Sequence, residues 1–190
     1  MPGTILIPPD LELRPVSLFD AAELYEAVDR NRERLSRWLP WVTSEYCLDD
    51  AVRFVGTRVE ENASGTALAM LIREGGRLCG AIGLHRIDRL HRSSSIGYWV
   101  DADAEGRGIV TRACRAIVEV GFTRYNLHRI EIRCATGNAR SRGVPRRLGF
   151  VEEGLLRDAE WLHDHWVDLC VFSQLEAEWK SLQGTSTVTV

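Results

Sequence analysis

The segment that most constrains the fold spans residues 96–116 and reads IGYWVDADAEGRGIVTRACRA. Its first five residues alternate β-branched or aromatic side chains with others, which is typical of a strand. After the G-R-G turn at 106–108, apolar residues recur at helical spacing from Ile109 to Val120, which predicts an amphipathic helix. A strand that enters a helix through such a turn presents unpaired N–H groups and the positive end of the helix dipole. The segment therefore predicts a seat for a phosphate or pyrophosphate.

Two common phosphate loops do not fit this turn. A dinucleotide-binding fingerprint needs a third glycine at position 111, where the chain has Thr111. A Walker loop needs Gly-Lys-Ser/Thr after a longer spacer, and the segment contains none. A generic nucleotide-binding protein is therefore the least favoured interpretation.

The letters DAEGRGI, which begin at Asp103 and follow YWV, resemble the acetyl-CoA pyrophosphate loop of the GNAT superfamily of N-acetyltransferases. Asp103 stands where the pattern of that family has Gln or Arg, so the likeness lies in the backbone part of the loop. The resemblance implies acetyl-CoA as cosubstrate, with its pantetheine arm paired to the exposed edge of the strand. Arginines 107, 112, 115, 146 and 147 offer cations for the phosphates, or else solvate helix faces. The expected cofactor-binding residues are Trp99, Val100, Gly106, Arg107, Gly108, Ile109, Val110, Thr111, Asn138 and Arg147.

Three further segments extend this resemblance over most of the chain, from Leu11 to about Trp179. NARS at 138–141 and RLGF at 147–150 match the second family signature at the right spacing. DAEW at 158–161, followed by Asp168-Leu169, is similar to the RimJ/RimL branch, the ribosomal-protein N-terminal acetyltransferases. The implied fold is a single-domain α+β GNAT fold. It has a mixed, mostly antiparallel sheet of about seven strands, flanked by helices, with splayed central strands.

Local patterns agree with an α+β fold. Asn138 is expected to cap a helix that runs to Arg147, and Glu74-Gly75-Gly76 predicts a hairpin turn. Apolar periodicity predicts further helices over residues 17–28, 31–39 and 49–63, and a last helical turn over 175–182. Alternation predicts strands over residues 11–14, 66–73, 77–86, 96–100, 128–135, 150–157 and 165–175.

Composition and charge narrow the class of protein. The 190 residues suit one domain; we place the acetyltransferase domain at 1–183 and expect a disordered tail at 184–190. A formal net charge of −3 argues against general affinity for nucleic acid. The first residues lack the basic and apolar regions of a signal peptide or a membrane anchor. Five scattered cysteines predict neither a disulfide framework nor a zinc site, and a reducing cytoplasm fits them.

Acetyl transfer from a thioester needs a hydrogen-bond donor for the departing thiolate. Many GNAT enzymes use a tyrosine, but Pro145 stands at that position here. The RimL-like branch resembles this chain in having a serine at Ser141, and this resemblance implies that its hydroxyl serves the sulfur. The alternative is that Ser141 is only a polar residue in the first turn of the helix that Asn138 caps.

The reaction also needs a base for the amine. The resemblance implies Glu160, because the matching glutamate of the RimL-like branch is the proposed general base. Residues 152–168 contain six acids, and Arg157 is the only Lys or Arg among them. Neighbouring carboxylates are expected to raise one another's pKa and attract a cationic amine. A solvated acidic strand face is the alternative.

For the acceptor, Trp38 and Trp41 are expected to wall the pocket, and Tyr98 to orient the substrate; otherwise these rings cover core. His163 and His165 alternate onto one strand face, but they lack a clear third ligand, so no metal is expected.

The leading hypothesis is a cytoplasmic, acetyl-CoA-dependent N-acetyltransferase that transfers acetyl directly to a primary amine. The Rim-like resemblance implies the N-terminal α-amine of a protein, such as a ribosomal protein. A small-molecule amine or antibiotic acetyltransferase and a non-catalytic CoA-binding module remain open. The expected partners are acetyl-CoA and the amine, with no nucleic acid or membrane; family likeness suggests a homodimer.

Overall fold

A computed structural model describes residues 3–184. The strands are β1 (Ile5–Ile7), β2 (Leu11–Pro15), β3 (Leu68–Glu74), β4 (Arg77–Asp88), β5 (Ser93–Val100), β6 (Arg129–Ala135), β7 (Val151–Leu162) and β8 (His165–Leu175). The α-helices are α1 (Ala21–Arg30), α2 (Arg32–Ser36), α3 (Leu48–Ser64), α4 (Ile109–Thr123), α5 (Ala139–Arg147) and α6 (Glu176–Gly184), and the short 3-10 turns are η1 (Leu18–Asp20) and η2 (Ala102–Ala104).

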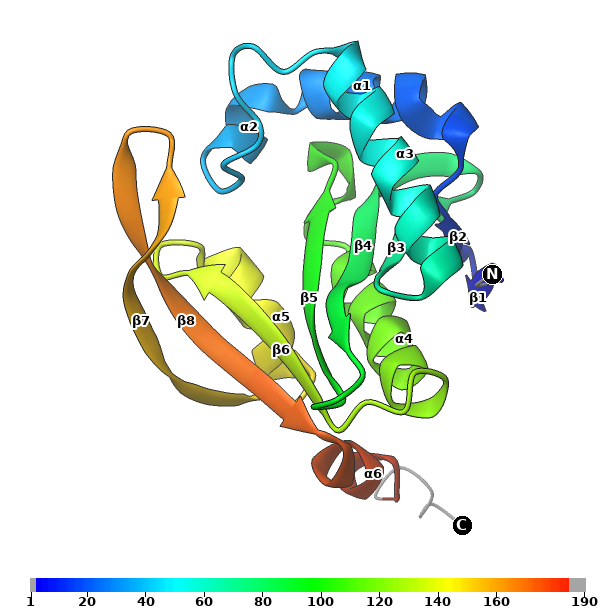
Figure 1. Cartoon of the computed structure of the whole chain (residues 1–190), viewed down its shortest axis with the longest axis vertical. Helices are drawn as coiled ribbons and strands as arrows, with labels where there is room; N and C mark the ends of the chain where they lie inside the picture. Colours follow the sequence, from blue (N-terminus) through cyan, green and yellow to red (C-terminus); the bar gives the residue numbers. More distant parts are fainter. Residues whose placement is uncertain (1–2, 185–190) are drawn as a thin grey trace.

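The strands form one sheet in the order β1-β2-β3-β4-β5-β6-β8-β7 (Figure 1). Neighbouring strands run antiparallel, except for the parallel pair β5 and β6. The predicted α+β fold with a mixed, mostly antiparallel sheet is confirmed.

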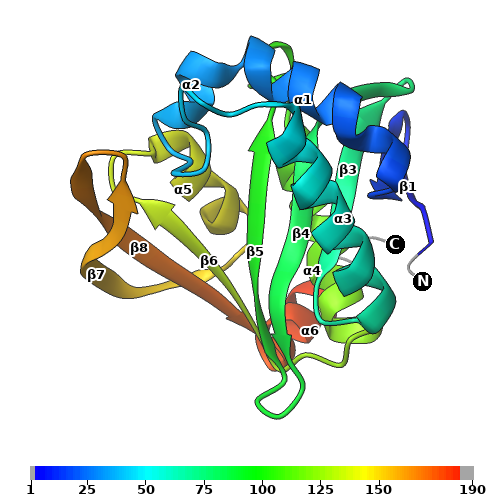
Figure 2. The ribbon, with the colours of Figure 1, turned by 45° about the horizontal axis from the view of Figure 1, so that its top comes forward.

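Helices cover both faces of the sheet, and β3 shows how the layers separate. Its first five residues are all buried, and successive side chains of a strand point to opposite faces. Met70 packs into a cluster with Ile117 of α4, whereas Leu71 packs with Leu24 of α1 and Val55 of α3. The sheet therefore lies between α4 and the pair α1 and α3 (Figure 2).

The sheet opens between β5 and β6. These strands pair only where Ser93–Ser95 meets Arg129–Glu131, and beyond that point they diverge (Figures 1 and 2). The predicted splay of the central strands is present, and we call the resulting gap the β5–β6 crevice. The candidate site is built along it.

Several element boundaries differ from those predicted. Ser17 and Asp20 form a capping box on η1, so α1 starts at Ala21 rather than at residue 17. The strand β1 is too short for alternation to reveal, and it makes the sheet eight-stranded rather than seven-stranded. β7 runs to Leu162, past a bulge, instead of ending near 157. Gly184 closes α6, and the rest of the tail placed at 184–190 lies outside the described residues.

Candidate active site at the β5–β6 crevice

The crevice exposes backbone groups of β5. The Asp101 N–H donates to the Cys79 carbonyl oxygen at 2.7 Å, which fixes the phase of the antiparallel β4–β5 ladder. Because backbone groups alternate in direction along a strand, those of Trp99 point toward β4, and those of Tyr98 and Val100 point into the crevice. An extended ligand there can pair with Tyr98 and Val100 as an added strand would. Trp99 lies outside the crevice, since its side chain packs against the apolar clusters of α1, α2 and α3.

The glycine turn leaves open space at the start of α4. Gly106 and Gly108 both have left-handed backbones, with φ of 72° and 73°, which glycine adopts at little energetic cost. A Cβ built on either glycine would meet no atom within 4 Å. Gly108 is the N-cap of α4, and the Ile109 side chain that follows is buried in the core. The first N–H groups of α4 are therefore the donors that this turn presents.

Arg147 is the sequence-predicted cation that best suits this seat. Its Nη2 donates to Thr111 Oγ1 in the first turn of α4 at 3.2 Å, and in the described part of the chain no carboxylate pairs with it. Val110, between Ile109 and Thr111, packs against the core. Three other predicted arginines are already paired, Arg107 with Glu74 at 2.7 Å, Arg112 with Asp10 at 3.0 Å and Arg146 with Glu152 at 2.7 Å.

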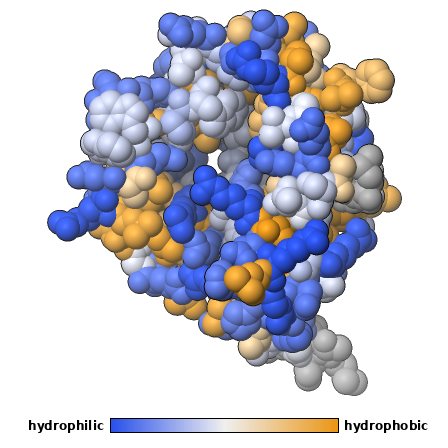
Figure 3. Space-filling view, viewed as in Figure 1, coloured by the Kyte–Doolittle hydropathy of each residue, from blue (hydrophilic) through white to orange (hydrophobic). Residues whose placement is uncertain are grey.

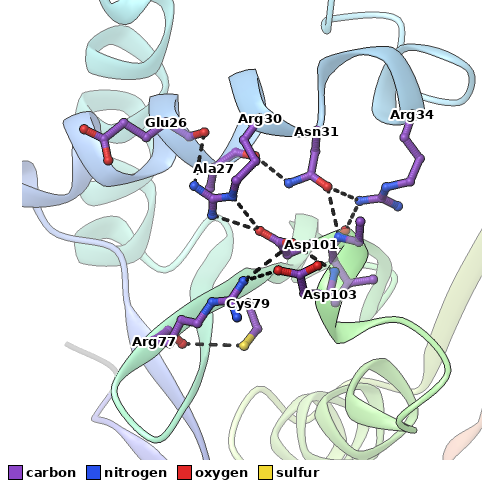
Figure 4. A network of polar contacts seen from close by, with 11 residues as sticks. Glu26, Ala27, Arg30, Asn31, Arg34, Arg77, Cys79, Asp101 and Asp103 are labelled. Atoms are coloured by element: carbon purple, nitrogen blue, oxygen red, sulfur yellow. Dashed lines mark hydrogen bonds and ion pairs between the residues drawn. The ribbon is translucent and has the colours of Figure 1, made fainter.

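A polar network holds the loop between β5 and α4 against α1 (Figure 4). The buried carboxylate of Asp101 accepts hydrogen bonds from Arg30 Nη2 at 2.8 Å and from the Asp103 N–H at 3.1 Å. Burial raises the pKa of Asp101, but these hydrogen bonds outweigh it and hold the pKa below its ordinary value. The Asn31 side-chain oxygen accepts the Ala102 N–H at 2.9 Å. Asp103, although it departs from the family pattern, thus helps to shape the loop through its backbone.

Arg34 of α2 connects this loop to the crevice. Its guanidinium donates to the Val100 carbonyl oxygen and pairs with Glu105 at 2.5 Å. Glu105 also pairs with Arg140 of α5. A loop carboxylate therefore bridges α2 and α5, the helices on the two sides of the crevice.

Ser141 lies in the crevice, in the first turn of α5. The Asn138 side chain accepts the Ser141 N–H at 3.0 Å, which confirms the predicted cap. The Ser141 Oγ donates to the Cys134 sulfur at 3.2 Å and lies 3.1 Å from the Tyr98 hydroxyl. Capping and a hydroxyl directed at sulfur therefore coexist at this residue.

Glu160 comes from β7, directly opposite Val167 of β8. Opposed side chains of an antiparallel pair share a face of the sheet, and Val167 lines the cavity described below. Burial raises the pKa of Glu160 above its ordinary value. A carboxylate that holds a proton more strongly than usual is better suited to take one from an amine.

The predicted cause of that shift is wrong. Glu153 pairs with Arg129 at 2.5 Å, and hydrogen bonds from Arg129 and Ser173 lower its pKa to about 2. A hydrogen bond from Arg146 lowers the pKa of Glu152. Glu152 and Glu153 are thus paired with arginines from α5 and β6, and burial alone shifts the pKa of Glu160.

A cavity of about 550 Å³ lies between α2, the end of β6 and the β7–β8 hairpin. Trp38 lines it, together with Leu162 and Val167. His163, at the hairpin tip, contacts the Ser36 carbonyl oxygen through Nε2 at 2.8 Å and so ties the hairpin to α2. Trp41 lies elsewhere, packed on Tyr46 with ring centroids 5.7 Å apart. The structure brings one of the two predicted tryptophans to this cavity.

Several residues of this region escaped sequence reasoning. His163 contacts a backbone carbonyl oxygen at Ser36, and a backbone partner cannot be predicted from residue types. Arg34 and Glu105 lie too far apart in the sequence for their ion pair to be predicted. The alternation of His163 and His165 predicted that both lie on one strand face, but it did not reveal that they line the cavity. Among residues 3–184, no group of three or more His, Cys, Asp or Glu side chains is arranged to hold a metal ion. Over that same range, no helix is long and apolar enough to cross a bilayer.

Known proteins resemble this chain over most of its length. Residues 10–151 match the family described as "Acetyltransferase (GNAT) domain". The "Putative ribosomal N-acetyltransferase YdaF" of Bacillus subtilis (strain 168) is 36% identical over 164 residues, which cover 85% of this chain and 88% of that protein. The "Ribosomal-protein-serine acetyltransferase" of Escherichia coli (strain K12) is 30% identical over 175 residues, which cover 92% of this chain and 98% of that protein.

A solved structure agrees with the observed fold. The ribosomal L7/L12 alpha-N-protein acetyltransferase RimL, in complex with coenzyme A, superposes with a TM-score of 0.87 at 25% identity, covering 90% of this chain and 97% of that chain. The family match spans well over half of the sequence, and its segment contains β5, the glycine turn and α5. This chain is therefore an acetyltransferase that belongs to the GNAT family.

Proposed function

We propose that this enzyme transfers the acetyl group of acetyl-CoA directly to the N-terminal α-amine of a protein, with ribosomal proteins as the first candidates. One observation carries the proposal. The crevice joins a phosphate seat, a strand edge that no other strand covers and the Ser141 hydroxyl beside Cys134, and the acceptor cavity begins at the next residue of β6, Ala135. The names of the relatives from Bacillus subtilis and Escherichia coli support the choice of acceptor.

For the donor, the N–H groups at the start of α4 and the Arg147 guanidinium would hold the pyrophosphate of acetyl-CoA. The backbone groups of Tyr98 and the N–H of Val100 would pair with the amides of the pantetheine arm, while the Val100 carbonyl oxygen accepts from Arg34. These donor-binding residues do not include Trp99, because its backbone groups point toward β4. They do not include Arg107 either, because its guanidinium pairs with Glu74.

For the chemistry, Glu160 takes a proton from the ammonium group of the acceptor, which frees the nitrogen lone pair for attack. The nitrogen forms a bond to the thioester carbon, the C–S bond breaks, and its electron pair remains on sulfur. Ser141, whose hydroxyl donates to the Cys134 sulfur at 3.2 Å, would donate to the departing sulfur in the same manner. The remaining surplus proton of the nitrogen passes to the thiolate, so that CoA leaves as a thiol.

For the acceptor, the cavity offers an apolar wall at Trp38 and Leu162 and a rim of imidazoles at His163 and His165. The surface is hollowed in the middle of the face shown in Figure 3, between α2 and the diverging strands. A peptide N-terminus can enter such a hollow while the rest of its chain stays in solvent. A fully enclosed site would instead favour a small amine.

The test is release of CoA thiol from acetyl-CoA in the presence of peptides that begin with Ser or Ala. Spermidine and an aminoglycoside are assayed beside them, and the same peptides with blocked N-termini serve as matched controls. Release with free peptides alone supports the proposal, and Ser141→Ala should slow it. Release with small amines alone would make the enzyme a small-molecule acetyltransferase. CoA binding without release to any amine would favour a CoA-binding module.

The β7 edge of the sheet is our candidate for a homodimer interface. β7 is an edge strand with a single neighbour, β8, and exposed edges invite pairing with another chain. Large apolar side chains stay exposed on this edge and its hairpin, namely Val151, Leu155, Leu156, Trp161 and Trp166. Light scattering should give twice the monomer mass for the wild type, and Trp166→Arg should lower that mass toward the monomer value. A wild type that is monomeric at all concentrations would contradict the proposal.

The acetyltransferase domain, in our proposal, extends past the family match at residue 151 to residue 183. β8 pairs along the full length of β6, and Trp179 of α6 packs on Phe122 with ring centroids 5.3 Å apart, so the last elements share the core.

A ribosomal-protein acceptor places the enzyme in the cytoplasm.

A further inference from the structure

We propose that Tyr98 is a positioning residue that aims the Ser141 hydroxyl at the reacting sulfur, and not a contact for the acceptor. The inference rests on the proposed function, in which Ser141 serves the leaving group. Tyr98 comes from β5, Ser141 from α5 and the neighbouring Cys134 from β6. Three polar groups from three elements thus meet at the point where the strands have separated.

The hydrogen bonds at this point limit the directions open to the Ser141 hydroxyl. A carbonyl oxygen only accepts, so the 3.0 Å contact between Tyr98 Oη and the Ser141 carbonyl oxygen requires the phenol to donate. The phenol oxygen keeps its lone pairs and lies 3.1 Å from Ser141 Oγ. The Ser141 hydrogen then has two acceptors, the Cys134 sulfur at 3.2 Å and the phenol oxygen. The hydroxyl is thereby confined to the crevice.

Tyr98 also fixes the backbone that carries Ser141. Its bond to the Ser141 carbonyl oxygen and the bond from the Ser141 N–H to Asn138, at 3.0 Å, hold the same peptide segment from two sides. A catalytic hydroxyl must be held within about 0.5 Å of its productive position, and neighbouring hydrogen bonds provide that restraint. Removing the phenol oxygen leaves the cap as the one hydrogen bond described here that still holds the Ser141 peptide segment.

The environment suits Tyr98 to donate a hydrogen bond but not to give up a proton. Burial raises the pKa of Tyr98 far above its ordinary value, so the phenol stays neutral wherever Glu160 can act as a base. A buried phenolate would be costly. The ring packs against the main core cluster, and both hydrogen-bond contacts of the hydroxyl described above are with Ser141. Its hydroxyl therefore serves Ser141.

The test is a double-mutant cycle in kinetics with Tyr98→Phe, Ser141→Ala and the double variant. Tyr98→Phe keeps the ring and should lower kcat about tenfold, the equivalent of one hydrogen bond, with KM unchanged for acetyl-CoA and for the peptide. The double variant should be no slower than Ser141→Ala, because the phenol acts through the missing hydroxyl. Tyr125→Phe, which removes a phenol oxygen beyond the far end of α4, is the matched control and should leave kcat unchanged.

Each result supports or overturns the inference. Equal kcat losses from Tyr98→Phe in the wild-type and Ser141→Ala backgrounds would overturn it, and so would a raised KM for the peptide at unchanged kcat. CoA calorimetry and urea unfolding on every variant separate misfolding from lost positioning. A wild-type enzyme that acetylates no amine would overturn the proposed function itself. An active wild type with additive losses would overturn the role of Tyr98 alone.

Discussion

Gly108→Ala should weaken CoA binding far more than it weakens the fold. Gly108 has a φ of 73°, and a Cβ at this position would meet no atom within 4 Å. The substitution should therefore lower the free energy of unfolding only by the strain of an alanine in the left-handed conformation, about 1–2 kcal/mol. Under the proposed function, the same Cβ would stand where the pyrophosphate approaches the first N–H groups of α4. Losing one charge-assisted hydrogen bond costs about 1.5–3 kcal/mol, which raises the Kd of CoA roughly 10- to 150-fold.

Gly65→Ala provides the matched control. Gly65 ends α3 with a φ of 67°, and a Cβ there would meet only the end of the Arg89 side chain, at 3.0 Å. The residue precedes β3, and it is the last residue of that strand, Glu74, that pairs with Arg107 of the glycine turn. Both variants should therefore lose a similar free energy of unfolding, measured with urea, and only Gly108→Ala should lose CoA affinity, measured by titration calorimetry. Equal affinity in the two variants would refute the placement of the phosphate seat.

Three further predictions concern the base, the loop and the core. Glu160→Gln should lower kcat/KM about a hundredfold or more and remove the fall in rate that the wild type shows as pH drops through the raised pKa of Glu160; an unchanged pH profile would exclude this base. Asp101→Asn should cost about 1–3 kcal/mol at pH 7. Because the folded pKa of Asp101 lies below its unfolded value, that stability is present above about pH 4 and is lost as pH falls through the folded pKa. The urea midpoints of Asp101→Asn and the wild type should thus converge in acid, and a constant gap would contradict the account. Phe172→Ala removes a fully buried ring and should lower the free energy of unfolding by about 3–5 kcal/mol; a urea midpoint close to that of the wild type would contradict this assignment to the core.

The parts of the site that the sequence predicted are those whose geometry is local. A strand, two glycines and a helix N-terminus follow one another in the chain, so their order alone implies the phosphate seat. The cap of Asn138 on Ser141 spans three residues and is equally readable. Alternation located β5, and the direction of its backbone groups then followed from one hydrogen bond, Asp101 to Cys79.

The parts that were missed depend on contacts between distant segments. The acidic run predicted carboxylates that raise one another's pKa, but Glu153 pairs with Arg129 from another strand, and sequence proximity cannot reveal that partner. Trp38 and Trp41 looked equivalent on either side of Pro40, yet only the first faces the cavity. The Arg34–Glu105 bridge and the tie from His163 to Ser36 likewise arise only when the sheet has assembled.

The two substrate sites draw on different stretches of the chain. The crevice that would hold the donor comes mainly from β5 to α5, in the middle of the sequence, whereas most of the cavity lining comes from α2 and the residues after it, near the start, and from the β7–β8 hairpin, near the end, with the end of β6 between them. The family match ends at residue 151, just before that hairpin completes the cavity. Substitutions or length changes in the β7–β8 hairpin can therefore alter the acceptor while leaving the donor site intact, whereas α2 serves both sites through the bonds of Arg34 to Val100 and Glu105. Over evolutionary time, such a chain is free to inherit its thioester chemistry unchanged and to acquire new amines by varying its C-terminal hairpin.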